Sequence, residues 1–257
     1  LSKMFNLMMK AGHVPTNFAK SYTVPILKGH FSAFSKSVNA NDFRGIAISP
    51  VISKVFEHCI VDRYCMFLVT SDNQFGFKKS VGCSHAVFTL RNVVSYYVSC
   101  NSTVNICALD LSKAFDKMNH YGLFIKLMDR QIPVQLLQLL EFWFRSGLTC
   151  VKWGDCFSAF YSQARGIRQG GVLSPYLFAL YIDSVIEKVR RSRVGCEIKL
   201  ESVGIIVYAD DILLVAPTVT ALQLLLKMCE NELNWLAMSI NASKSACLRI
   251  GEDYENC

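Results

Sequence analysis

The sequence predicts an α+β fold, because apolar runs typical of strands are interleaved with amphipathic stretches typical of helices. Residues 104–111 form a short apolar run, which predicts a buried strand. Residues 202–216 contain two apolar runs separated by Asp210 and Asp211, a pattern that predicts a β-hairpin. Within residues 83–97 apolar side chains recur every three or four positions, which predicts an amphipathic helix.

Capping patterns and periodicity predict the remaining elements. Ser174 followed by Pro175 is typical of a helix N-terminus, and Thr220 with Gln223 has the spacing of a capping box. Helical periodicity is expected to break near Pro133. The other expected helices are 50–68, 123–144, 174–188 and 220–236, and the other expected strands are 19–27 and a pair within 150–161.

The composition indicates a globular protein, and its net positive charge is suited to binding a polyanion. The chain has 257 residues and is 52% hydrophobic, which is ample for a core. Its 27 Lys and Arg against 20 Asp and Glu give a net charge of +7 without any basic block. Charge alone is equally compatible with an ordinary, slightly basic soluble protein.

The cysteines and the longest apolar stretch bear on location. The eleven cysteines are an odd number in a chain without a signal peptide, so we expect reduced thiols and an intracellular protein of the nucleus, the cytoplasm or both. The longest apolar stretch, 203–228, is interrupted by Asp210 and Asp211. Two carboxylates are very costly in lipid, so no membrane partner is expected.

The chain shows no internal repeat or low-complexity linker, so one compact unit with subdomains is expected. It opens at Leu1 within an amphipathic segment and has its first methionine at Met4. We therefore expect it to be a piece of a longer polypeptide.

Three acids stand where acids are energetically expensive. Asp110 ends one apolar strand, and Asp210 with Asp211 interrupts two more. Clustered carboxylates need compensation, and their hard oxygens favour Mg²⁺, or Mn²⁺, over zinc. The alternatives are a plain hairpin turn for the pair and a helix cap for Asp110.

Longer motifs surround these acids. The segments ALDLSKAFDKMNH, RGIRQGGVLSPYLFALYID and YADDILLV occur in this order and resemble the three central palm motifs of reverse transcriptases. Upstream lie two segments that resemble the finger motifs of the family, VPILKG and NDFRGIAISPVISKVFEHCI. Retrotransposon and group II intron enzymes carry a further typical segment, which is similar to QFGFKKSVGCSHAVFTLRNVV here. The motif that follows the hairpin in the family is similar to LNWLAMSINASKSACLRIG.

The subtype follows from two details. The YADD box and the QFGF segment are similar to those of jockey-like and other non-long-terminal-repeat (non-LTR) retrotransposons, and a group II intron type of reverse transcriptase is the alternative. The resemblance implies a right-hand polymerase fold with an antiparallel palm sheet packed on helices. Fingers would comprise 1–103 and 119–164, and palm 104–118 and 165–257. The endonuclease and thumb domains of the same polyprotein are expected to be absent from this chain.

The function that the resemblance implies is RNA-directed DNA polymerisation, the addition of dNTPs to a DNA primer on an RNA template. Asp110 and Asp210 would flank two Mg²⁺ ions, and Asp211, expected in the turn, would complete the charge. The alternatives are a nucleic-acid-binding scaffold that lost its chemistry and an inactive relic of an element.

The resemblance also gives roles to residues near the nucleotide. Phe115 matches the position that excludes a ribose 2′-hydroxyl, and a core aromatic is the alternative. Gln169 and Gly170 would let the backbone approach a nucleotide or the template, and a glycine-rich turn is the alternative.

Three basic residues are further candidates. Arg44 matches the finger residue that contacts the incoming triphosphate, and Lys28 is a second candidate for that contact. Lys244 could protonate the pyrophosphate leaving group. Each lysine has an ordinary surface position as its alternative. The cluster 142–145 (Phe-Trp-Phe-Arg) could stack on single-stranded template, although its helical spacing favours a core position.

Overall fold

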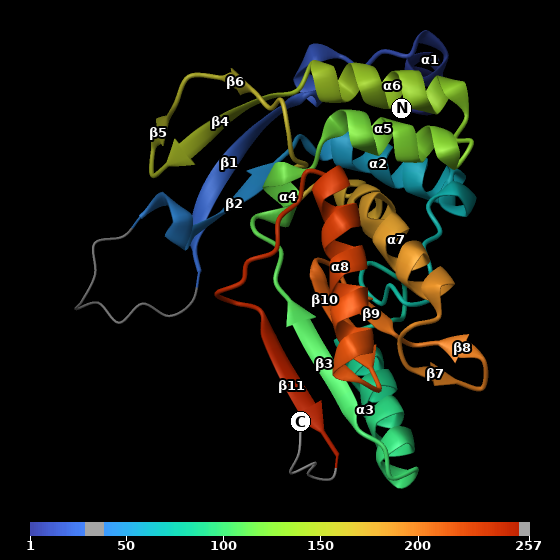
Figure 1. Ribbon diagram of the computed structural model, residues 1–257. Coiled ribbons are helices and arrows are strands. Elements are labelled where there is room, and N and C mark those ends of the chain that lie inside the picture. The colour runs from blue at the N-terminus through green and yellow to red at the C-terminus, as the bar shows by residue number, and fades with distance from the viewer. Residues whose placement is uncertain (29–38, 252–257) are drawn as a thin grey trace. The chain divides into compact units, whose positions relative to one another are not determined.

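Figure 1 shows a computed structural model of the protein, which describes residues 1–28 and 39–251. The chain folds into two compact units, each built from two stretches of sequence. Unit 1 comprises residues 1–68 and 120–174, and unit 2 comprises residues 69–119 and 175–257.

Unit 1 combines a mixed sheet with helices. The strand β1 pairs antiparallel with β2 and parallel with β4, which also pairs with the short strands β5 and β6. The strands are β1 (Lys20–Leu27), β2 (Phe43–Ile48), β4 (Leu148–Trp153), β5 (Cys156–Phe157) and β6 (Tyr161–Ser162). The helices are α1 (Ser2–Ala11), α2 (Val51–Arg63), α5 (His120–Asp129) and α6 (Val134–Arg145), with 3-10 turns η1 (Thr16–Phe18), η2 (Ala40–Asp42) and η3 (Cys65–Phe67).

Aromatic side chains form much of the core of unit 1. The Phe56 ring of α2 stacks on Trp143 of α6 with ring centroids 5.8 Å apart, and it lies 4.8 Å from the ring of Phe5 in α1. The Trp143 indole is buried and donates its N–H to the carbonyl of Phe18. Trp143 in the 142–145 cluster is therefore a core residue, as its helical spacing favoured.

Unit 2 is built on a four-stranded antiparallel sheet in the order β11-β3-β10-β9 (Figure 1). These strands are β3 (Val104–Leu109), β9 (Ile205–Tyr208), β10 (Asp211–Ala216) and β11 (Ala246–Ile250), and β7 (Glu197–Ile198) pairs separately with β8 (Glu201–Ser202). The helices are α3 (Cys83–Ser99), α4 (Ala114–Lys117), α7 (Ser174–Ser192) and α8 (Val219–Trp235).

Helices cover both faces of this sheet, because alternating residues of its strands point to opposite faces and apolar residues lie on each. On one face Val93 of α3 packs in a buried cluster with Ile106 of β3 and Val215 of β10. The intervening residues, such as Leu214 of β10, point to the other face, where α8 buries Cys229. An α+β architecture is thus present, and acids lie at the ends of two strands, β3 and β10, whose other residues are mostly buried.

The structure differs from the sequence expectation in the hairpin. We expected Asp211 in the turn, but it is the first residue of β10 and pairs with Tyr208 of β9. The turn consists of Ala209 and Asp210, and Ala209 has the left-handed φ of 59°. A tight two-residue connection places the second acid of the pair on the strand itself.

The two compact units divide the chain at other positions than the expected fingers and palm ranges, which stay a prediction. Residues 69–103 were assigned to the fingers, but they belong to unit 2. The physical reason is that Ala86 and Val93 of α3 share a buried cluster with Val104 and Ile106 of β3. Residues 165–174, expected in the palm, lie in unit 1.

None of the helices within 1–28 and 39–251 combines the length and the apolar character needed to cross a bilayer.

Candidate active site

Two of the predicted acids lie at the same end of neighbouring strands. Asp110 directly follows β3, and Asp211 begins β10. The antiparallel register pairs Leu109 with Ile212, so one step beyond this pair brings Asp110 opposite Asp211. Asp210 lies in the turn before β10 and is partly exposed.

The electrostatics show that the two carboxylates interact. Asp211 is an exposed residue, but partial burial of its carboxyl raises its pKa above the usual range, and the negative charge of Asp110 raises it further. Among the residues that the structure describes, no three His, Cys, Asp or Glu side chains form a ready-made metal cluster. This donor set still fits Mg²⁺, because Mg²⁺ is usually held by one or two carboxylates together with water and substrate phosphates.

A loop that precedes β11 holds Asp110. The Asn241 Nδ2 atom donates to Asp110 Oδ2 at 3.1 Å, and the Asn241 backbone N–H donates to the Asp110 carbonyl at 2.8 Å. The Asp110 backbone N–H donates to Ser245 Oγ at 3.1 Å. Sequence analysis missed Asn241 and Ser245, although both lie in the segment that resembles the motif after the hairpin.

Lys244 belongs to the same loop. Its backbone N–H donates to the Asn241 carbonyl at 3.1 Å, and its side chain is exposed. The structure thus places Lys244 on the segment that contacts Asp110, whereas the predicted role of its ammonium group stays a prediction.

Phe115 lies in α4, between a buried ring and a second aromatic. Its ring stacks on Phe178 of α7 with centroids 4.3 Å apart, and it makes a T-shaped contact with Phe77 at a centroid distance of 6.2 Å. Phe178 is fully buried, whereas Phe115 is partly exposed. Phe115 therefore has one side in the core and part of its surface open, which is compatible with either predicted role.

In unit 1 the loop with Gln169 and Gly170 packs against β2. The Gln169 carbonyl accepts the Ala47 N–H at 2.7 Å. Gly170 has a φ of 122°, and a Cβ there would lie 2.5 Å from the Ala47 carbonyl oxygen. A side chain at this position is therefore excluded, so packing against β2 is enough to explain the glycine at position 170, without any ligand.

A buried carboxyl that sequence analysis missed, that of Glu57, supports this loop. Glu57 of α2 accepts the Leu173 N–H at 2.8 Å. Burial raises the pKa of Glu57, while backbone hydrogen bonds and the charge of Arg168 oppose this rise. Arg168 donates to the Ala19 carbonyl. Burial lowers the pKa of Arg168, and the charge of Glu57 offsets this only in part.

The predicted triphosphate contacts lie on the β1–β2 hairpin. Arg44 of β2 is exposed and is paired with Ile26 of β1. Lys28 follows β1, and its ammonium donates to the Asn41 carbonyl at 3.0 Å. This bond favours an ordinary surface role for Lys28 over a triphosphate contact, since the ammonium already links the segment after β1 to the segment before β2.

A surface of aromatic rings and lysines on the unit 1 sheet was not predicted. The Lys152 ammonium lies 5.5 Å from the Phe157 ring centroid and 5.8 Å from that of Tyr22. Lys20 lies 5.8 Å from the ring centroid of Phe160. We call these five residues the aromatic–lysine surface. Exposed rings beside cations are typical of surfaces that bind single-stranded nucleic acid.

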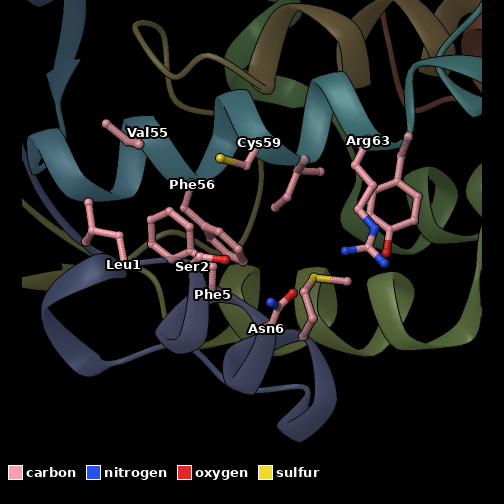
Figure 2. Close-up of a pocket in the computed structure, with 11 residues that line it drawn as sticks. Leu1, Ser2, Phe5, Asn6, Val55, Phe56, Cys59 and Arg63 are labelled. Carbon is pink, nitrogen blue, oxygen red and sulfur yellow. The ribbon is translucent and has the colours of Figure 1, made fainter.

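The structure also contains a pocket of about 360 Å³ between α1 and α2, and its lining does not include the acids (Figure 2). Phe5 and Phe56 point into it together with Cys59, and Arg63 lies at one end. The lining is mainly apolar and contains no carboxylate, so it lacks the carboxylate ligands by which proteins usually hold Mg²⁺.

Known proteins resemble this chain in both sequence and fold. Residues 31–252 match the family model described as reverse transcriptase (RNA-dependent DNA polymerase). The chain is 27% identical over 256 residues to the Pol polyprotein from the type-2 retrotransposable element R2DM of Drosophila melanogaster, covering 97% of this chain and 23% of that protein. It is 24% identical over 268 residues to the RNA-directed DNA polymerase from the mobile element jockey of Drosophila funebris, covering 99% of this chain and 28% of that protein.

Among solved structures, the fold resembles that of apo telomerase from Candida tropicalis. The TM-score is 0.65 at 11% identity, and the match covers 97% of this chain and 48% of that one. The chain spans about a quarter of the length of the two retrotransposon proteins, with 23% and 28% covered. Because the family model covers most of the chain and the fold agrees with it, the chain belongs to the reverse transcriptase (RNA-dependent DNA polymerase) family.

Proposed function

We propose that this chain is the polymerase part of a non-LTR retrotransposon protein and adds dNTPs to a primer 3′-hydroxyl on an RNA template. The observation that carries the proposal is the placement of Asp110 opposite Asp211 at one end of a sheet, where the charge of one raises the pKa of the other. Membership of the family and the likeness to R2 and jockey proteins support the choice of reaction.

The acids are the proposed ligands of two divalent cations. Asp110, Asp210 and Asp211 supply hard carboxylate oxygens, which suit Mg²⁺ or Mn²⁺. Bound ions would stabilise the charge that develops on the primer oxygen and on the triphosphate. The interaction of Asp110 with Asp211 supports this assignment, because such a pair is relieved by a cation.

The chain's own residues would orient the acids and select the substrate. Asn241 fixes the carboxylate of Asp110 by its side-chain amide, so the ligand oxygens are oriented before substrate binds. We propose that Phe115 limits the space beside the nucleotide sugar and that Lys244 donates the proton that the pyrophosphate needs on leaving. Arg44, and with less structural support Lys28, would bind phosphate oxygens, while the backbone at Gln169 and Gly170 would lie along the nucleotide or template.

In terms of the right-hand fold, we propose that the sheet β11-β3-β10-β9 with its helices is the palm. The mixed sheet of unit 1 with its helices corresponds to the fingers. The proposed partners are an RNA template, a DNA primer and the other domains of a longer polyprotein, in the nucleus, the cytoplasm or both.

The rival functions are a nucleic-acid-binding scaffold without chemistry and an inactive relic. The usual sign of a scaffold is replacement of the acids, and all three acids are present. Primer extension on poly(rA) with oligo(dT), with and without Mg²⁺, separates the three, using both the 257-residue chain and a longer chain that includes the thumb. Mg²⁺-dependent extension supports the polymerase. Tight binding of the template without extension in the longer chain would favour the scaffold, and neither activity would indicate a relic.

A further inference from the structure

A buried glutamine makes polar contacts with the turn that carries Asp210. The Gln74 side chain is fully buried, and its Oε1 atom accepts the N–H groups of Ala209 at 3.1 Å and Gly76 at 2.8 Å. Its Nε2 atom donates to the Ala209 carbonyl at 3.4 Å. One amide side chain thus contacts both backbone groups of the residue that precedes Asp210.

The backbone around Gln74 runs parallel to β9. The Val207 N–H donates to the Asn73 carbonyl and the Phe75 N–H donates to the Val207 carbonyl, both at 2.8 Å. A Cβ at Gly76 would lie 2.3 Å from the Ala209 nitrogen, so only glycine allows the segment to come this close. Residues 73–76 therefore lie directly against the hairpin.

Ala209 needs such support. Its φ of 59° is left-handed, a conformation that residues with a Cβ adopt at a cost. A strained backbone persists when the surrounding structure holds it in place. The hydrogen bonds with Gln74 hold both the N–H and the carbonyl of Ala209. The backbone of Ala209 in turn sets the direction in which the chain continues into Asp210 and Asp211.

We propose that Gln74 is a positioning residue: it fixes the Ala209 turn so that Asp210 and Asp211 present their carboxylates to a divalent cation. The inference rests on the proposed function, because it assigns the acids as cation ligands. Groups that orient metal ligands typically affect metal affinity or activity by about 10- to 100-fold, so the effect is measurable.

The matched control is the neighbouring amide. Asn73 is also buried, and its Nδ2 atom donates to the carbonyls of Ile205 at 2.7 Å and Ser202 at 3.2 Å. These contacts lie before or at the start of β9, away from the turn at its end. Asn73→Leu should therefore lower stability without disturbing the acids, whereas Gln74→Met removes the contacts with Ala209 at similar side-chain length.

The experiment measures Mn²⁺ binding to the 257-residue chain by electron paramagnetic resonance, counting only the binding that Asp110→Asn abolishes. Urea unfolding is followed in parallel. Gln74→Met should weaken Mn²⁺ binding by about tenfold and raise the Mg²⁺ concentration for half-maximal extension, with extension recovering at high Mg²⁺. Asn73→Leu should lower the unfolding midpoint with Mn²⁺ binding unchanged. Equal Mn²⁺ affinity in Gln74→Met and the parent chain would overturn the proposal.

Two further measurements keep the proposal testable if Gln74→Met fails to fold. Gly76→Ala pushes the same segment away from the turn and should reproduce the loss of Mn²⁺ affinity. In the parent chain the Ala209 amide should exchange slowly with deuterium, and exchange as fast as in an open loop would reject the contact. Mn²⁺ binding and exchange need no turnover. If the parent chain binds Mn²⁺ at the acids but neither it nor the longer chain extends a primer, the polymerase proposal is refuted and the role of Gln74 stands.

Discussion

Asn241 and Asp110 are joined by two hydrogen bonds, one from the Asn241 side-chain amide to the Asp110 carboxylate at 3.1 Å and one from backbone to backbone at 2.8 Å. The side-chain bond limits the rotation of the carboxylate while leaving its other oxygen available. Asn241 is separated from Asp110 by 131 positions in the sequence, so only the fold brings them together.

Asn241→Ala should reduce the rate of primer extension by about tenfold, because a carboxylate that loses its orienting partner binds and places a cation less well. Single-turnover extension at saturating dNTP measures the effect. Ser243→Ala is the matched control, since the Ser243 hydroxyl donates to Asn241 Oδ1 at 2.8 Å on the far side from Asp110. Equal losses in the two variants would argue against an orienting role.

Asp110→Asn should abolish extension while leaving the fold intact. The variant keeps an oxygen that can accept from Asn241, and it removes the charge that raises the pKa of Asp211. In metal-free buffer at neutral pH its unfolding midpoint should therefore equal or exceed that of the parent chain, because like-charge repulsion is relieved. Asp210→Asn should likewise abolish extension, and the exposed Asp116→Asn should not. Substantial extension by purified Asp110→Asn would remove this acid from the site.

Phe115→Ala should increase the incorporation of ribonucleotides if its ring limits the space for a 2′-hydroxyl. Truncation of a buried Phe typically costs about 3 to 5 kcal/mol, and the cost here should be smaller because Phe115 is partly exposed. For each variant, the ratio of ribonucleotide to deoxynucleotide incorporation measures discrimination, and the unfolding midpoint, determined in parallel, measures stability. Phe115→Tyr, which keeps the ring, should keep the discrimination. A folded Phe115→Ala protein with unchanged discrimination would show that the ring has only a core role.

Stability should depend on pH through His120. Burial lowers the pKa of His120 below its ordinary value, and a 2.7 Å hydrogen bond with the Gly166 carbonyl opposes this only in part. Between the lowered folded pKa and the unfolded pKa of about 6.5, the unfolded chain binds more protons, so the free energy of unfolding falls as the pH drops through this window.

Urea unfolding of the parent chain and of His120→Gln at about pH 7.5 and about pH 5.5 measures this contribution. Gln can retain a donor for the Gly166 carbonyl but does not titrate. The loss of stability on acidification should therefore be smaller in His120→Gln than in the parent chain. Identical losses would show that His120 is not responsible.

The aromatic–lysine surface gives a prediction for template binding. Phe157→Ala should weaken binding of a short single-stranded RNA, because stacking of a base on an aromatic ring is worth about 1 to 3 kcal/mol. Trp153→Ala is the control, since Trp153 is also exposed but alternation of the strand directs it to the other face, where its ring meets Phe43 at 5.3 Å. Fluorescence anisotropy at several salt concentrations measures the affinity, and equal effects in the two variants would contradict a role for this face.

The sequence by itself determined the elements whose patterns are local. Apolar spacing predicted α3 and the β9–β10 hairpin, and a short apolar run predicted β3, because the periods of helices and strands are written in neighbouring residues. The motifs around Asp110 and Asp210 indicated the family, which the comparison with known proteins confirmed. These inferences needed no knowledge of which segments touch.

Only the tertiary structure decided which side chains meet. The register that places Asp211 on β10 opposite Asp110, the Asn241 contact and the burial of Glu57 with Arg168 join residues that are far apart in the chain. Gln74 lies 135 positions before Ala209, and a glutamine has no pattern that separates a buried contact from an exposed side chain. The physical reason is that such contacts depend on strand register and on the packing of helices against sheets, which are properties of the whole folded unit and not of any local period.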